Sequence, residues 1–172
     1  DREFLLHVLD GGILAANDVK RWQRDPDFYA SEVTGSAYVI MRRPYAPAAE
    51  RLKSLIARER KMPAMLQAAR ENLVNPPRIY TEIALSQIDG NISFFKNDLP
   101  GAFTEVTDAA LLKEFKQTND SVMAALADYK KWMQQELLPK SNGDFAYGAE
   151  LYQKALAADD MIDVPIADLL LV

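Results

Sequence analysis

The stretch from Met62 to Leu99 constrains the fold most strongly, because two adjacent prolines separate two helical patterns. The first helix can open at Pro63, since the first turn of a helix does not need the N–H group that proline lacks. Pro76 and Pro77 end this helix and can begin the next one. Apolar residues then recur at steps of three to five residues, at Ile79, Ile83, Ile88, Ile92 and Phe95. The sequence therefore predicts a helix, a corner and a second helix with an apolar stripe.

Helical spacing of apolar residues continues on both sides of this corner. It predicts helices over residues 2–22, over residues 26–41 and over residues 48–62. Within the first of these, Gly11 and Gly12 indicate either close packing or a break, because a glycine inside a helix costs about 1 kcal/mol relative to alanine.

The longest helix is predicted over residues 108–138. Thr107 or Asp108 can cap its start, because both side chains accept hydrogen bonds from free backbone N–H groups. Pro139 stops it. At about 1.5 Å per residue this helix would extend about 45 Å, long enough to brace a whole domain. A last helix is predicted over residues 145–156.

The fold class follows from these patterns. No alternation of apolar and polar residues typical of strands occurs, and hydrophobic residues make up 49% of the chain and charged residues 26%, as in ordered globular proteins. We predict an all-α fold, an irregular multi-helix bundle of about seven to nine helices with one long central helix near residues 108–138. A chain of 172 residues is long enough for one core, so we predict a single helical domain over residues 1–172.

The two ends of the chain predict a fragment of a larger protein. The first residue is Asp1 and not methionine, and the last residues form the apolar run Leu169–Val172. Apolar surface of this kind is seldom left in water. We therefore expect this run to be covered by the remainder of a parent chain or by a second copy.

Charge argues against a nucleic-acid partner. The chain has 20 basic and 25 acidic side chains, a net charge of −5. One basic cluster lacks the interleaved aromatic residues that stack on bases, so we interpret it as a solvated helix face. This cluster consists of Arg42, Arg43, Arg51, Lys53, Arg58, Arg60 and Lys61.

Several classes of chemistry are excluded by simple counts. The chain has no cysteine, and His7 is the only histidine, so neither a thiolate metal site nor a histidine pair for zinc exists within this sequence. The glycine-rich patterns of phosphate loops and the Gly-x-Ser-x-Gly elbow of serine hydrolases are also absent. No apolar run approaches the roughly 20 residues of a membrane span. The sequence therefore predicts no metal, cofactor or catalytic residue within this segment.

Carboxylates beside the proline corner leave one alternative open. Glu71 and Glu82 flank the corner, where buried carboxylates can act in acid–base chemistry. Pairing with Arg70 or Arg78 is the simpler interpretation. An enzyme that uses carboxylates alone is therefore the least favoured hypothesis.

Five segments, taken together, resemble a bacterial family called domain of unknown function 885 (DUF885). They occur in the family's order over most of the chain, and each one alone is a weak motif. These segments are Trp22–Tyr29, Arg51–Arg58, Met62–Leu73, Asn75–Pro77 and Phe145–Tyr152.

The resemblance implies a scaffold role. Members of this family are much longer, largely helical and similar to zinc metallopeptidases, with a His-Glu-x-x-His helix far downstream of this region. The resemblance therefore implies a non-catalytic helical segment of a zinc-peptidase-like hydrolase, which forms scaffold and one wall of a substrate cleft. Zinc would belong to the full-length parent, and the segment alone would be inactive. A self-contained helical protein-interaction module without enzymatic activity is the alternative.

The resemblance also implies candidate residues, partners and a compartment. A peptide substrate of the parent is an expected partner, while nucleic acid and a membrane span are not expected. Many members carry export signals, which implies a periplasmic or otherwise exported protein, although composition alone is equally compatible with the cytoplasm. The polar positions within matching segments that are candidates for lining the cleft are Arg70, Asn72, Tyr80, Glu82, Gln87 and Tyr147.

Overall fold

The computed structural model describes residues 1–169, and the chain divides into two compact units. The core unit comprises residues 22–143, and the terminal unit comprises residues 1–21 together with the chain from residue 144 onward. Residues 1–169 contain helices and turns but no strand, so the predicted all-α class is confirmed. The prediction of one domain over residues 1–172 stays a prediction.

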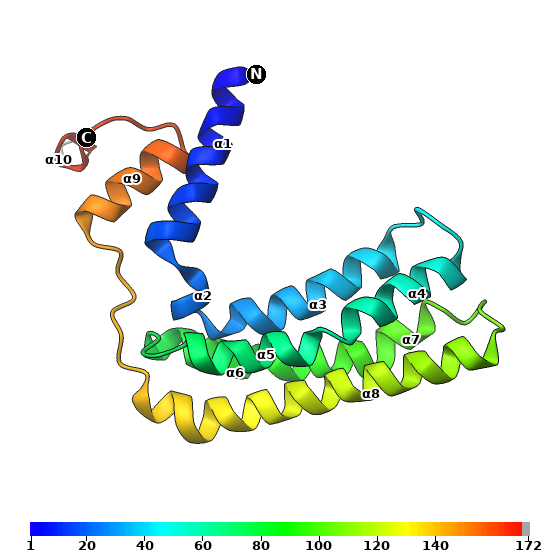
Figure 1. Cartoon of the computed structure of the whole chain (residues 1–172). Helices are drawn as coiled ribbons and strands as arrows, with labels where there is room; N and C mark the ends of the chain where they lie inside the picture. Colours follow the sequence, from blue (N-terminus) through cyan, green and yellow to red (C-terminus); the bar gives the residue numbers. More distant parts are fainter. Residues whose placement is uncertain (170–172) are drawn as a thin grey trace. The chain divides into compact units, whose positions relative to one another are not determined.

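One long helix organises the core unit (Figure 1). This helix, α8, packs on α4, α5 and α6, and these three helices in turn pack on α3. A π-helical turn, η2 (Phe94–Asp98), follows α6, and η3 (Met133–Leu137) and η4 (Leu138–Lys140) extend α8. The helix α2 (Arg21–Arg24) precedes α3. The α-helices that lie wholly within this unit are α3 (Pro26–Arg42), α4 (Ala48–Glu59), α5 (Met62–Asn72), α6 (Arg78–Ser93), α7 (Leu99–Gly101) and α8 (Ala109–Trp132).

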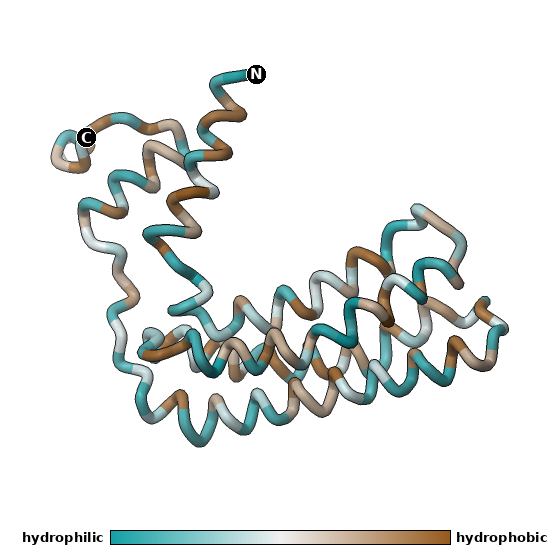
Figure 2. Tube along the Cα trace, viewed as in Figure 1, coloured by the Kyte–Doolittle hydropathy of each residue, from teal (hydrophilic) through white to brown (hydrophobic). Residues whose placement is uncertain are grey.

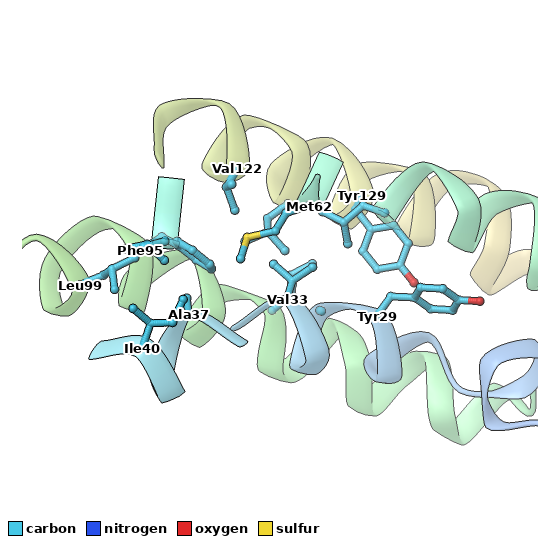
Figure 3. Packing of buried hydrophobic residues seen from close by; sticks show 14 of the residues in the cluster. Tyr29, Val33, Ala37, Ile40, Met62, Phe95, Leu99, Val122 and Tyr129 are labelled. Carbon is cyan, nitrogen blue, oxygen red and sulfur yellow. The ribbon is translucent and has the colours of Figure 1, made fainter. Parts of the chain in front are cut away.

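The hydrophobic core of this unit forms where α3 faces the turn after α6 and the middle of α8. Figure 3 shows Val33, Ala37 and Ile40 of α3 directed toward Phe95 and its neighbours. These four side chains are at most 2% exposed. Along each helix hydrophilic and hydrophobic residues alternate (Figure 2), as amphipathic helices packed on a common core require.

Three local predictions are confirmed. Pro63 lies in the first turn of α5, and Pro77 immediately precedes α6, so the prolines form the predicted corner. The start of α8 is capped by Asp108, whose carboxylate accepts from the N–H groups of Ala110 and Leu111. The alternative cap, Thr107, is therefore not used.

The apolar stripe of α6 differs from the prediction. Ile88 is fully buried, but Ile79 is 48% exposed and Ile83 is 41% exposed. Thr81 and Ala84 are buried in their place. Thr81 can enter the interior because its hydroxyl hydrogen-bonds the buried Ser141 hydroxyl at 2.8 Å.

The terminal unit is built from α1 (Arg2–Leu14) and α9 (Ala149–Asp159), which pack together. Gly11 and Gly12 do not break α1, which continues to Leu14. Gly11 marks close packing instead, because a Cβ atom there would lie 2.5 Å from the Asp159 carboxylate. The last predicted helix begins later than expected, at Ala149 and not at residue 145.

A short helix, α10 (Ile166–Leu169), ends the described part of the chain. Gln153 holds its start, since its side chain donates to the Val164 carbonyl and accepts from the Ile166 N–H. Residues 170–172 of the apolar run lie outside the described residues, so its covering stays a prediction. Among the helices formed by residues 1–169, none has both the length and the apolar character needed to cross a bilayer.

Candidate functional site

Three helices of the core unit bring two tyrosines and an asparagine together. Asn72 donates a hydrogen bond from its side-chain amide to the Tyr29 hydroxyl at 3.0 Å, and that hydroxyl donates to the Trp22 carbonyl. The Tyr129 hydroxyl donates to the Pro26 carbonyl at 2.9 Å. We call Tyr29, Asn72 and Tyr129 the tyrosine cluster. It ties α5 and α8 to the chain segment that leads into α3.

The phenols of this cluster remain protonated over the ordinary pH range. Burial raises the pKa of Tyr29, and the hydrogen bond from Asn72 opposes this rise by a smaller amount. Burial also raises the pKa of Tyr129. Electrostatic interactions with Tyr29, Asp25 and Asp27 raise this pKa further, whereas Arg70 lowers it. Both hydroxyls therefore act as hydrogen-bond donors and not as bases or nucleophiles.

Arg70 lies beside the tyrosine cluster on the surface of α5. Its guanidinium contacts the Asp128 carboxylate at 2.6 Å and lies 5.6 Å from the centre of the Trp132 ring. Trp132 in turn stacks on Tyr129, with ring centres 5.6 Å apart. Exposed ion pairs contribute about 0–1 kcal/mol, so this arrangement mainly orients α5 on α8.

The remaining candidate residues do not join Arg70 and Asn72. Tyr80, Glu82 and Gln87 lie along α6, where Tyr80 is half-buried and the other two are exposed. Glu82 pairs with Arg78 at 2.8 Å, as the simpler interpretation of the corner carboxylates predicts. Tyr147 belongs to the terminal unit, where it lines a cavity of about 340 Å³.

The proline corner is held by a distant loop that the sequence did not reveal. The Gly143 N–H donates to the Pro76 carbonyl at 3.2 Å, and the Asn142 N–H donates to the Asn75 side chain at 3.1 Å. A Cβ atom at Gly143 would overlap the Asn75 carbonyl oxygen and lie 3.2 Å from the carbonyl carbon of Pro76. Only glycine permits this approach. The Asn142–Gly143 pair was recognisable as a turn, but its partner was not.

Arg51 corrects the interpretation of the basic cluster as a solvated face. Arg51 is only 8% exposed, and no carboxylate among residues 1–169 forms an ion pair with it. It donates instead to the carbonyls of Ile40, Met41 and Ala46 at 3.0–3.1 Å, and its guanidinium lies 5.5 Å from the centre of the Phe103 ring. A cation at the end of α3 is stabilised by the free carbonyls and the dipole of that helix. Arg51 therefore acts as a cap, at the edge of a cavity of about 480 Å³.

Glu59 is a second buried ionisable group that the sequence pattern missed. It ends α4, is fully buried, and accepts a hydrogen bond from the Thr118 hydroxyl on α8. Its other oxygen, Oε1, has no hydrogen-bond partner in the part of the chain that the structure describes. Burial raises the pKa of Glu59 to about 7, an effect that the Thr118 hydrogen bond reduces. A glutamate at the end of an amphipathic helix gives no sequence signal of burial.

These residues do not fit a zinc site. Among residues 1–169, no three histidine, aspartate or glutamate side chains lie close enough together to hold a metal ion. Tetrahedral zinc sites in proteins use three or four such ligands or thiolates.

Comparison with known proteins identifies the family. A family model described as "Bacterial protein of unknown function (DUF885)" matches residues 2–170. The chain belongs to the DUF885 family. None of the curated proteins matches this DUF885 chain. The family resemblance inferred from the sequence is thus confirmed, while the likeness to zinc metallopeptidases stays a prediction.

A solved structure resembles this DUF885 chain closely. The similar protein is described as "a putative lipoprotein of unknown function" from Shewanella oneidensis. It is 29% identical, with a TM-score of 0.82 over 97% of this chain. The matched region covers 31% of that protein, so the DUF885 chain spans less than a third of its relative's length.

Proposed function

We propose that this DUF885 chain is a non-catalytic helical segment of a larger zinc-peptidase-like hydrolase, in which it forms scaffold and one wall of a substrate cleft. The observation that carries the proposal is the match of nearly the whole chain to only 31% of a longer, similar protein. The polar side chains of the core unit support the scaffold role, because Arg70, Asn72 and Tyr129 connect helices to one another.

The outer face of α6 is the wall that we propose. Residues three or four apart lie on one side of a helix, so Ile79, Tyr80, Ile83 and Gln87 share one surface. Ile79 and Ile83 are 48% and 41% exposed, Gln87 is exposed and Tyr80 is half-buried. Apolar patches with interspersed hydrogen-bonding groups suit an extended peptide, which has both apolar side chains and a polar backbone. We call these four residues the α6 wall.

The test uses the chain itself and a longer protein that contains it. We expect the 172-residue chain to hydrolyse no peptide with or without zinc, and the longer protein to show zinc-dependent hydrolysis. Gln87→Ala and Ile83→Ser in the longer protein should raise KM several-fold with little change in kcat, because they alter binding and not chemistry. Lys53→Ala, at an exposed site on α4, is the matched control and should change neither constant.

Each part of the proposal has its own contradicting result. Zinc-dependent turnover by the pure 172-residue chain would contradict a non-catalytic segment. A longer protein without hydrolase activity would contradict the hydrolase assignment. Unchanged KM in both α6 variants would contradict the proposed cleft wall and leave scaffold as the proposed role of the chain.

Export from the cytoplasm belongs to the same proposal. It is supported by the description of the similar Shewanella protein as a lipoprotein. Fractionation of cells that produce the longer protein should recover it outside the cytoplasm, and recovery with cytoplasmic markers would contradict export.

A self-contained interaction module is the second candidate. The exposed apolar residues of the terminal unit favour it, since monomers rarely expose apolar patches of large area. A partner protein that binds the 172-residue chain and the longer protein with equal affinity would support the module over the scaffold.

A further inference from the structure

The helix α1 exposes an unusually continuous apolar surface. Five large apolar side chains on it are each 54–62% exposed, and hydrophobic positions recur along the helix (Figure 2). Their spacing of one and four residues places them on one broad side of the helix. We call this surface the α1 stripe. It consists of Phe4, Leu5, Val8, Leu9 and Ile13.

The stripe is not the side of α1 that packs on α9. Leu14 is the buried residue of α1, and Gly11 is the residue whose missing Cβ leaves room for Asp159 of α9. At about 100° per residue, Leu14 and Gly11 lie on a side adjacent to the stripe. The stripe is therefore additional to the surface that the terminal unit already uses.

Gly12 lies within the stripe, and no contact with another of the described residues requires it to be glycine. A Cβ atom at this position would meet nothing within 4 Å, in contrast to Gly11. A glycine inside a helix costs about 1 kcal/mol relative to alanine. A missing side chain at the centre of an apolar face allows another backbone or a bulky side chain to approach closely. Gly12 thus leaves room for a close neighbour at the centre of the stripe.

The charge of α1 and the length of the similar solved protein favour a protein segment over a lipid surface as the occupant of the α1 stripe. Glu3 and Asp10 outnumber Arg2 on α1, and an acidic helix is repelled by anionic lipid surfaces. The similar solved protein, by contrast, has more than two-thirds of its length outside the region that matches this chain. The apolar stripe of an amphipathic helix typically faces a protein core, and the regular elements that form the core within residues 1–169 are all helices.

We propose that an amphipathic helix from the part of a longer DUF885 protein outside residues 1–172 packs on the α1 stripe and places a large side chain over Gly12. This inference rests on the proposed function only in assuming that the chain is one segment of a longer protein. It makes α1 the surface through which the terminal unit is joined to the remainder of that protein.

Cysteine labelling tests this directly, because the chain has no cysteine of its own. Leu9→Cys reports on the stripe, and Asp10→Cys, at an exposed position on the same helix, is the matched control. In the 172-residue chain we expect a maleimide reagent to label both at similar rates. In the longer protein, with mass spectrometry to locate the label, Leu9→Cys should react at least tenfold more slowly and Asp10→Cys at an unchanged rate.

A second variant tests the role of Gly12. Gly12→Leu should leave the helical content of the 172-residue chain unchanged, since its Cβ meets nothing there. In the longer protein it should restore rapid labelling of Leu9→Cys, because the added side chain displaces the occupant.

Three outcomes would overturn the inference. Equal labelling of both cysteines in the longer protein would show an uncovered stripe. Slow labelling of Leu9→Cys in the dilute 172-residue chain would show that the chain covers its own stripe. Protection that rises with the concentration of the 172-residue chain would identify a second copy as the occupant. A protected stripe in an inactive longer protein would contradict the proposed hydrolase function alone.

Discussion

At the scale of single residues, the hydrogen bonds around Glu59 indicate the protonation state of its carboxyl group. The Thr118 hydroxyl has one proton but two acceptors within reach, the Glu59 carboxylate and the Phe115 carbonyl at 3.1 Å. If Glu59 is protonated, it donates to Thr118, and Thr118 can then donate to Phe115. The protonated acid satisfies both bonds, and the carboxylate leaves one of them unmade.

We predict that this group makes the core unit less stable as the pH rises. The pKa of Glu59 is about 7 in the folded chain and 4.5 when it is unperturbed, so the folded state binds more protons between these values. Stability is therefore full below about pH 4.5 and falls by up to about 1.4 kcal/mol per pH unit as the pH approaches 7. Urea denaturation at pH 5, 6, 7 and 8 measures this slope.

Glu59→Gln is the matched variant, because an amide keeps the donor to Thr118 and does not titrate. Other titrating groups contribute equally to the pH dependence of stability in both proteins. The difference between the two slopes of unfolding free energy against pH is therefore the contribution of Glu59. Parallel slopes for the two proteins would show that Glu59 is ionised or solvated in the folded chain.

Residue-scale predictions from sequence succeeded where the signal was local. Asp108 was recognisable as a cap because a cap needs only its own short side chain and the N–H groups of the next residues. The burial of Arg51 and Glu59 was not recognisable, because it depends on contacts with Phe103 and Thr118, more than 50 positions away. Both residues occupy polar positions in an otherwise regular helical pattern.

At the scale of elements, the proline corner depends on a loop that joins it from far along the chain. The hydrogen bond between Asn142 and Asn75 connects residues 67 positions apart. Thr81 and Ser141 add a buried hydrogen bond beside it. The corner is therefore fixed by the tertiary structure as well as by its prolines.

We predict that Gly143→Ala destabilises the core unit by about 1–3 kcal/mol, since the new Cβ overlaps backbone atoms of the corner that cannot move separately. Thermal or urea unfolding monitored by circular dichroism measures the loss. Gly35→Ala is the control, because Gly35 lies within α3 with nothing near its missing Cβ. That change should stabilise by about 0.5–1 kcal/mol. Equal effects of the two substitutions would contradict the close approach at Gly143.

Element boundaries were largely predictable in the core unit, but the helix expected over residues 2–22 is interrupted at Lys20, which adopts a left-handed conformation. The buried side of α6 was not predictable either. The residues Leu52, Leu55 and Ile56 of α4 form one apolar side and are buried as expected. On α6, isoleucines occur on two sides, and hydrophobicity alone does not distinguish them. The side of α6 that is buried is the one with Thr81, whose hydroxyl is hydrogen-bonded to the buried Ser141 hydroxyl. This contact is absent from any local pattern.

At the scale of the whole molecule, the hydrophobic core cluster lies entirely within residues 22–143. We predict that a chain of residues 22–143 folds by itself, with helical circular dichroism and one cooperative unfolding transition, because it retains every residue of that cluster. The 172-residue chain is the reference. Loss of cooperativity in the shorter chain would show that the terminal unit contributes to the core.

The candidate site was the least predictable feature of the molecule. Family resemblance selected positions from segments spread over the chain, and the structure assigns Tyr147 to a different unit from Arg70 and Asn72. Resemblance identifies segments that relatives share, but it does not show whether their side chains meet. For Arg70 and Asn72 the structure supplies that answer, since both contact residues that join helices.

Arg51 and Glu59, described above as a helix cap and a buried acid, together determine the electrical state of the interior. They lie on the same helix, about 12 Å apart along its axis. At that separation two opposite charges attract by only about 1.4 kcal/mol, so they do not form a pair. Arginine remains charged at every ordinary pH, whereas the charge of Glu59 appears only near neutrality. At acidic pH the buried part of α4 therefore carries only the positive charge of Arg51. Above neutral pH the negative charge of Glu59 balances it.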